Sequence, residues 1–292
     1  MRGQLRTIRL LFLTNLLEFL CLIKAIFAAV NIVFGVMEAD KIVVHAMPPY
    51  GGSISASPFP IRVEMFLRLA KIPHTVSKKS PFHSYTKKTP WVEYKGQNIP
   101  DSTHILEMFV DDFKVDLDEH LTQEERAISR AFQRMLSEGA LFAGFAWRFT
   151  LSDNGKLMVK SLLGGGVVGN AISQFAGMGM RKNVWAQGTG RMTREQILKG
   201  CFDDIDACSV FLANKPYMMG DRVSFIDCLM FGFLQTIFFT FHCSTDENPI
   251  KDHMLKRQNL DSYRQRIQNE VFPDWKEIAE NKESTRTWAP DL

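Results

Sequence analysis

The chain has 292 residues, of which 46% are hydrophobic and 23% are charged, and its net charge is +3. This is the balance of an ordinary globular protein, long enough for one large or two medium domains. Basic and acidic residues are interspersed, and no basic block with interleaved aromatic residues occurs, which argues against nucleic acid as the main partner. The five cysteines have no close-paired spacing, so they predict neither a disulfide framework nor a metal site.

Residues 1–38 form a hydrophobic N-terminal segment. Its apolar run follows three arginines and is interrupted by Glu18 and Lys24. We expect a single-pass signal anchor that associates the protein with a membrane, because the run is long and has no clear small-x-small cleavage site. The charge bias would keep the N-terminus cytosolic. A secretory signal peptide and an amphipathic helix lying on a membrane or on the fold itself are the alternatives.

Residues 39–113 read as a βαβ-ββα unit of about 75 residues, which is the size of a small domain. A strand over residues 41–46 leads through a loop rich in Pro, Gly and Ser to Ser57, a favourable N-cap, with Pro58 at the first helical position. Apolar residues then recur at helical spacing as far as Ala70. An anion would be stabilised at this helix start, beside the Ser57 hydroxyl.

A second strand is expected over residues 73–77. Residues 88–105 read as a strand, a turn at Gly96, a short strand and a capped helix that begins at Asp101 and Ser102.

Residues 114–121 read as a linker and residues 122–280 as an all-helical domain. Capping sequences mark helix starts at Thr122, Thr193 and Ser224, and the apolar helix over residues 228–241 is expected at the centre of the core.

Two stretches of the helical half carry weaker signals. Residues 162–180 are rich in glycine, and we expect an irregular structure there. The G-x-G-x-x-G match at Gly164–Gly169 lacks a strand–turn–helix context, so it predicts a helix connection rather than a nucleotide site. Residues 281–292 are polar, and we expect a frayed tail.

Several motifs, in order along the chain, resemble one family. Ser57-Pro58-Phe59, Thr89-Pro90 and Asp101-Ser102 are similar to the thioredoxin-fold half of a glutathione transferase. Motifs of the second half resemble the Failed axon connections / cadmium-responsive (CDR) family, a metaxin-like branch of the glutathione transferase superfamily. These motifs are Trp185–Arg191, Lys215–Asp221, Ser224–Asp227, Asn259–Tyr263 and Phe272–Trp275.

The resemblance implies a thioredoxin-like N-terminal domain followed by an all-helical glutathione transferase C-terminal domain. It implies that Pro90 is cis and that the backbone of Thr89 binds the cysteinyl part of glutathione. Ser102 would take the γ-glutamyl carboxylate, which agrees with the preference of a carboxylate for a helix N-terminus beside a hydroxyl donor. Thr89, Pro90, Asp101 and Ser102 together would bind glutathione, and Ser57 would be the catalytic residue that hydrogen-bonds the sulfur. The family commonly reads Ser-Pro-Phe-Cys, whereas this chain has Pro60, which removes a thiol and a backbone N–H.

Other polar residues near these motifs have simpler interpretations. Tyr50, Ser53 and Ser55 are alternative hydroxyls for the sulfur, but hydroxyls beside two glycines mostly form turns. His45 and His104 are isolated, and we expect them to be satisfied or exposed.

Two functions from different classes follow. The first is a membrane-associated glutathione transferase-like protein, with glutathione as its cosubstrate, weak activity on a hydrophobic small molecule, and a role in metal or xenobiotic stress that only the resemblance implies. The second is a non-catalytic, metaxin-like adaptor at a membrane, acting through a homodimer or a protein partner. Neither a metal nor a nucleotide is expected, and the sequence leaves the choice between enzyme and adaptor open.

Overall fold

The computed structural model describes residues 41–78, 84–163, 166–241, 248–281 and 283–290. The expected membrane anchor, residues 1–38, lies outside the described residues. Within the described ranges, no helix is both long and apolar enough to cross a membrane.

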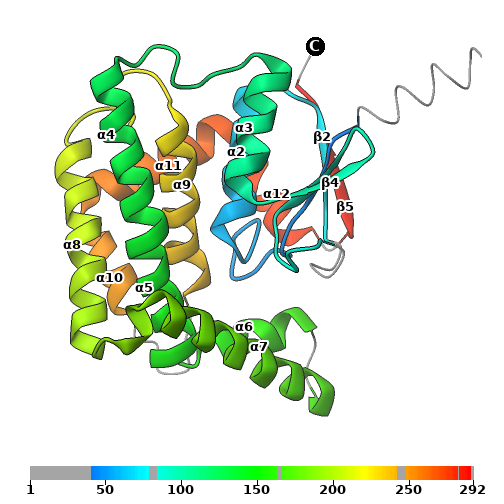
Figure 1. Cartoon of the computed structure of the whole chain (residues 1–292), viewed down its shortest axis with the longest axis vertical. Helices are drawn as coiled ribbons and strands as arrows, with labels where there is room; N and C mark the ends of the chain where they lie inside the picture. Colours follow the sequence, from blue (N-terminus) through cyan, green and yellow to red (C-terminus); the bar gives the residue numbers. More distant parts are fainter. Residues whose placement is uncertain (1–40, 79–83, 164–165, 242–247, 282, 291–292) are drawn as a thin grey trace, which may run out of the picture.

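The first half of the chain forms a mixed sheet, and helices α2 and α3 lie between this sheet and the helical half (Figure 1). The strand order is β4-β3-β1-β2-β5, in which only β1 and β2 are parallel. The expected order of strands and helices is confirmed. The elements are β1 (Val43–His45), α2 (Pro58–Leu69), β2 (His74–Ser77), β3 (Trp91–Tyr94), β4 (Gln97–Pro100) and α3 (Ser102–Phe113).

The fifth strand comes from the C-terminal end of the chain, where we expected a frayed tail. Residues Thr285–Trp288 form β5, which pairs antiparallel with β2. The hydroxyls of Thr75 and Thr287 lie 3.1 Å apart across this pair. The tail prediction was wrong because the polarity of residues 281–292 carries no information about a partner strand some two hundred residues earlier.

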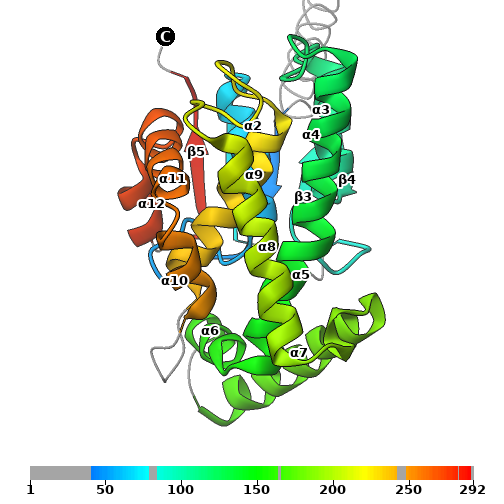
Figure 2. The same ribbon diagram turned by 90° about the vertical axis from the view of Figure 1, so that its left-hand side faces the viewer.

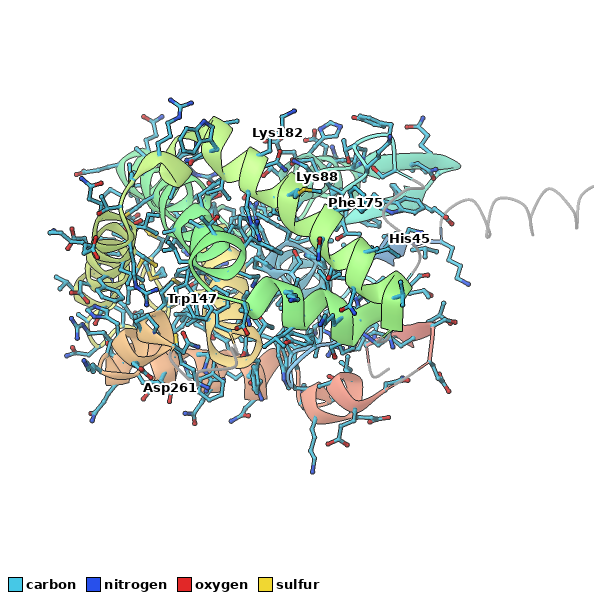
Figure 3. The ribbon with its side chains drawn as sticks, turned by 90° about the horizontal axis from the view of Figure 1, so that it is seen from below. His45, Lys88, Trp147, Phe175, Lys182 and Asp261 are labelled. Atoms are coloured by element: carbon cyan, nitrogen blue, oxygen red, sulfur yellow. The ribbon has the colours of Figure 1, made fainter. Side chains whose placement is uncertain are left out.

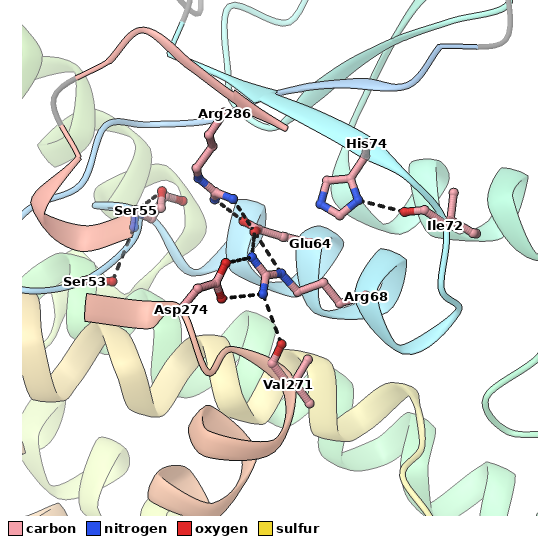
Figure 4. A network of polar contacts seen from close by, with 10 residues as sticks. Ser53, Ser55, Glu64, Arg68, Ile72, His74, Val271, Asp274 and Arg286 are labelled. Atoms are coloured by element: carbon pink, nitrogen blue, oxygen red, sulfur yellow. Dashed lines mark hydrogen bonds and ion pairs between the residues drawn. The ribbon is translucent and has the colours of Figure 1, made fainter. Parts of the chain in front are cut away.

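A buried ionic network ties β5 to α2 (Figure 4). Arg286 donates to both carboxylate oxygens of Glu64, with an Nη1 to Oε1 distance of 2.6 Å. Arg68 donates to Glu64 over 3.2 Å and forms a two-pronged ion pair with Asp274 at 2.6 and 2.9 Å. Burial alone would raise the pKa of Glu64, but Arg286 and Arg68 lower it to about 2.

The second half is a bundle of helices (Figure 2). Its first long helix contains two π-helical stretches, and α9 is buried along its length. The capping boxes expected at Thr122, Thr193 and Ser224 are all present. The elements are α4 (Gln123–Arg134), a π stretch (Met135–Ala140), α5 (Leu141–Ala146), a π stretch (Trp147–Leu151), α8 (Arg194–Leu212), α9 (Phe225–Gln235), a π stretch (Thr236–Thr240), α10 (Pro249–Leu255), α11 (Gln258–Val271) and α12 (Trp275–Glu280).

The glycine-rich stretch is helical, against our expectation of an irregular structure. It forms α6 (Asn154–Leu163) and α7 (Gly166–Gln187), followed by a short 3₁₀ turn (Thr189–Arg191). Seen from below, α7 crosses the face of the molecule (Figure 3). Each glycine disfavours a helix by up to about 1 kcal/mol, but Ser173, Gly177 and Val184 on one side of α7 are buried, and this packing overrides the local preference.

Candidate functional site

The start of α2 places Ser57 where the sequence predicted it. Ser57 is the N-cap, with an extended backbone (φ −124°, ψ 140°), but its hydroxyl makes no capping bond. An N-cap hydroxyl usually accepts from the N–H of the second or third helical residue, and here the third is Pro60, which has no N–H. The hydroxyl of Ser57 is therefore left available at the positive end of the helix.

Helix α9 fixes this helix start from the other half of the molecule. Gly232 of α9 lies so close to the first turn of α2 that a Cβ on it would be 2.6 Å from the carbonyl oxygen of Pro58. A real Cβ does not approach a backbone oxygen so closely, so a residue without a side chain is required here. The position of Ser57 thus depends on contact between the two halves.

We expect Gly232→Ala to lower the free energy of unfolding by about 1–3 kcal/mol and to displace the first turn of α2, because the added methyl group forces the two helices apart. Urea denaturation followed by circular dichroism measures the first effect. Gly200→Ala is the matched control, since a Cβ on Gly200, an exposed residue of α8, meets nothing within 4 Å. Equal stability of the Gly232 variant and the wild type would contradict the prediction.

The loop between β1 and α2 is held by the helical half. Residues Tyr50 and Ser53 close a turn by reciprocal backbone bonds of 3.1 and 3.0 Å. The two glycines between them have positive φ angles of 63° and 96°, which glycine adopts without strain. Trp275 of α12 donates from Nε1 to the carbonyl oxygen of Gly52 over 2.9 Å. This turn confirms that the loop residues serve first as turn formers.

The serines of this loop also form turns. The backbone N–H of Ser55 donates to Ser53 Oγ at 3.5 Å, and that of Ser57 donates to Ser55 Oγ at 3.2 Å. Both Ser53 and Ser55 are buried. Tyr50 is half-buried, and burial raises the pKa of its phenol, an effect that Arg148 partly offsets.

Arg148 is the buried cation beneath this loop, and sequence reasoning missed it. Its guanidinium donates to the carbonyl oxygen of Ala56 over 3.2 Å and to the hydroxyl of Thr240. Both Arg148 and Thr240 lie in π-helical stretches, which occur often at functional sites. Burial lowers the pKa of Arg148 to about 10, against a small opposing effect of Tyr50. Arg148 thus anchors the residue directly before Ser57.

The Thr89–Pro90 peptide bond is cis, as the resemblance implied. Pro90 is buried and Thr89 is half-buried, directly before β3. His45 at the end of β1 is stacked on Trp91, with ring centroids 3.6 Å apart, and its Nε2 lies 3.1 Å from a carboxylate oxygen of Glu93. His45 is therefore a satisfied side chain within the sheet, as expected.

Asp101 and Ser102 begin α3. Asp101 has a positive φ of 74°, and its Oδ1 accepts from the backbone N–H groups of Thr103 and His104 at 2.9 and 3.3 Å. Ser102 is buried, whereas Asp101 and His104 are exposed. The cap is thus Asp101, and Ser102 is the first helical residue, one of those whose N–H has no partner within the helix.

Strand register brings these segments to one end of the sheet. His45 pairs with Trp91, and Trp91 pairs with Pro100. The chain therefore leaves β1 toward Ser57, enters β3 from Pro90 and leaves β4 into Asp101 at the same end. The candidate residues come from three separate segments, and the register gathers the segments that carry them.

Arg62 links the two helix starts and is a second residue that sequence reasoning missed. It is buried on α2, and it donates to the hydroxyl of Thr103 over 3.1 Å and to Gln133 of α4 over 3.4 Å. Burial lowers the pKa of Arg62, while Cys228 and Asp101 act to raise it. The sequence does indicate that Arg62 is buried, because position 62 lies on the same helical face as Phe59 and Phe66.

An apolar cluster includes residues of this loop and of the helices next to it. Its buried members are Ala56, Phe149, Met158 and Val159. The half-buried residues packed on it come from the loop and from the helices α5, α6 and α7; they are Met47, Tyr50, Phe145, Leu162, Ala176 and Met180. A hydrophobic molecule near Ser57 would meet side chains of this kind.

The described cysteines have no reactive character. Cys201, Cys208 and Cys228 are buried, and burial raises the pKa of each thiol. In the described part of the chain, no group of three or more His, Cys, Asp or Glu side chains is placed to hold a metal ion.

Family models match both halves of the chain. The model described as glutathione S-transferase N-terminal domain matches residues 58–154, and that described as glutathione S-transferase, C-terminal domain matches residues 201–267. The structure is similar to a glutathione transferase of Phanerochaete chrysosporium, with a TM-score of 0.57, 12% identity, and coverage of 84% of this chain and 99% of that one. It is also similar to human glutathione S-transferase T1-1, with a TM-score of 0.50, 15% identity, and coverage of 82% and 87%.

Similar curated proteins indicate which part of the glutathione transferase superfamily the chain resembles. The chain is 29% identical to Failed axon connections of Drosophila melanogaster over 77% of its length, and the match spans only 56% of that protein. It is 27% identical to isoprene-epoxide–glutathione S-transferase of Rhodococcus sp. (strain AD45), over 67% of this chain and 86% of that one. It is 30% identical to metaxin-2 of Mus musculus over 33% of this chain and 35% of that one. Together these matches support the metaxin-like branch of the glutathione transferase superfamily, with Failed axon connections among its members, as the family that this chain resembles.

Proposed function

We propose that this protein binds glutathione at the end of the sheet where Ser57, Thr89-Pro90 and Asp101-Ser102 are gathered. The observation that carries the proposal is that two helices, α2 and α3, begin at this end. Helix N-termini stabilise anions, and glutathione in its reactive form carries a thiolate and a γ-glutamyl carboxylate. In this proposal the thiolate lies at the start of α2 and the carboxylate at the start of α3.

The start of α3 has complementary groups for both charges of the γ-glutamyl end. The N–H and hydroxyl of Ser102 would donate to the carboxylate. Asp101 uses Oδ1 to cap the helix, and Oδ2 would accept from the ammonium group. The backbone of Thr89, before the cis bond, would bind the cysteinyl part.

The transferase activity in this proposal is weak. The hydroxyl of Ser57 would hydrogen-bond the sulfur, which favours the thiolate. However, Pro58 and Pro60 remove two of the four N–H groups that normally point out of a helix start. The electrophile would be a hydrophobic molecule bound against the apolar cluster, and residues 1–38 would hold the protein at a membrane.

A non-catalytic role is the second candidate. The match to metaxin-2 and the missing N–H groups at α2 support a metaxin-like adaptor, which would use the same fold to contact a protein partner or a second copy at a membrane.

Isothermal titration calorimetry of the full chain with glutathione tests the proposal. We expect binding that Ser102→Ala weakens by about tenfold or more, since a lost charge-assisted hydrogen bond corresponds to at least that factor. His104→Ala is the matched control, because His104 is exposed on the same helical turn, and it should bind like the wild type. Ser57→Ala should retain binding but raise the pKa of the bound thiol, measured by ultraviolet absorbance. A folded wild-type protein that binds no glutathione would leave the adaptor as the surviving candidate.

A further inference from the structure

Helix α7 exposes a row of large apolar side chains, defined here as its outer face. The exposed fractions are 71% for Phe175, 58% for Trp185, 52% for Met178 and 43% for Ile172. The spacings of three and seven residues place all four on one side of the helix. Four large apolar residues on one side of a helix make a contiguous surface, unlike the single exposed residues that any protein has.

The opposite side of α7 already packs against the protein. Ala176 and Met180 lie on the apolar cluster, and Val184 belongs to the main core. Exposed polar residues, including Gln174 and Asn183, lie between the two sides. A helix that is apolar on two opposite sides is normally buried on both, so the outer face is suited to a partner outside the fold.

The charged side chains of the segment that carries the outer face all have the same sign. Residues 154–192 contain five basic side chains and no Asp or Glu. Lys182 is exposed and falls within the outer face, between Met178 and Trp185 in helical order. The guanidinium of Arg191 lies 6.0 Å from the ring centre of Trp185. Phe175 and Lys182 are both visible on the face of the molecule seen from below (Figure 3).

We propose that α7 lies in the interface of an anionic membrane, parallel to its surface. Ile172, Phe175, Met178 and Trp185 would enter the boundary between headgroups and acyl chains, as the apolar side of an interfacial helix does. Lys182 would extend its ammonium group toward lipid phosphates, and Arg191 would do the same beside Trp185. The exposed basic side chains of Lys182 and Arg191 match an anionic lipid surface.

The outer face consists of residues of α7 and not of residues 1–38, so this contact would add to the membrane association proposed above. The proposed contact between α7 and a membrane does not depend on glutathione binding, so each of the two proposals can be contradicted without affecting the other.

The test measures the polarity of the surroundings of α7 in the full-length protein. Phe175→Cys is labelled with an environment-sensitive fluorophore after Cys21 and Cys243 are replaced by serine; the three remaining cysteines are buried. Asn183→Cys, on the polar flank of the same helix, is the matched control. The vesicles are phosphatidylcholine with or without phosphatidylserine, and circular dichroism verifies the fold of each variant.

We expect the emission at position 175 to shift to the blue on vesicles with phosphatidylserine and to be quenched by brominated acyl chains, with a much smaller change at position 183. Lys182→Gln should weaken the partition by about fivefold, because each basic residue near an anionic surface contributes about 1 kcal/mol. An unchanged spectrum at position 175, even when the protein sediments with vesicles, would overturn the proposal. A spectrum already blue-shifted without vesicles would also overturn it, because residues 1–38 or a second copy would then cover the outer face.

Discussion

Glu64→Leu is expected to lower the free energy of unfolding by about 3–5 kcal/mol. The carboxylate of Glu64 is buried between Arg286 and Arg68, and removing it leaves Arg286 without its counter-ion. Removal of one partner from a buried ion pair has an effect of this size, larger than the net value of the pair. Urea denaturation of the variant and the wild type at neutral pH measures the difference.

The carboxylate of Glu64 also makes the free energy of unfolding of the wild type depend on pH in the acidic range. The pKa of Glu64 is about 2 in the folded protein and 4.5 in its reference state. A lowered folded-state pKa stabilises the protein above pH 4.5, and this contribution, about 3 kcal/mol, is lost as the pH falls from 4.5 to 2. Glu64→Leu should lack this part of the acid dependence. The double variant Glu64→Leu, Arg286→Leu should regain stability relative to the single one; an equal or lower stability would contradict this account.

Asp227→Ala is expected to lower the free energy of unfolding by about 3–5 kcal/mol. Asp227 is fully buried at the third position of α9 and accepts four hydrogen bonds, so its loss leaves four buried donors without an acceptor. Its Oδ2 accepts from the N–H and hydroxyl of Ser224 at 2.8 and 2.7 Å, and its Oδ1 accepts from the N–H of Met218 at 2.8 Å and the hydroxyl of Tyr263 at 2.7 Å.

The chain offers a matched control for this prediction. Glu125 occupies the same capping-box position in α4, bonded to Thr122, but at the surface. Glu125→Ala should have a much smaller effect, because water replaces the lost bonds there. If urea denaturation showed that both variants lose a similar free energy of unfolding, the capping motif itself, and not its burial, would determine the loss of stability.

Local patterns in the sequence predicted the parts of the fold that local physics determines. The helix starts at Thr122 and Ser224 follow from hydroxyl and carboxyl groups three residues apart, and the N-cap position of Ser57 follows from Pro58. The structure added one point at Ser57: its hydroxyl makes no capping bond, and Pro60 at the third helical position has no N–H to donate to it.

Features set by distant contacts could not be predicted from such patterns. Glu64 is separated from Arg286 by more than two hundred residues, and neither position looks unusual in its own segment. Arg148 is buried beside the candidate site, and nothing in its own segment indicates this; for Arg62, only its place on the apolar face of α2 does. The helix α7 was missed because glycine content describes the local preference only, whereas burial of one side decides the outcome.

Strand β5 has a consequence for how the protein is made. It covers β2, which would otherwise be an open edge of the sheet with unpaired backbone groups. The sheet half is therefore discontinuous in sequence: its last strand leaves the ribosome only after the whole helical half has been synthesised. A nascent chain that ends near residue 113 lacks both the cover for β2 and Arg286, one of the two counter-ions of Glu64. The sheet is thus completed only after the helical half has been synthesised, and loss of β5 would affect a sheet whose other strands all come before residue 101.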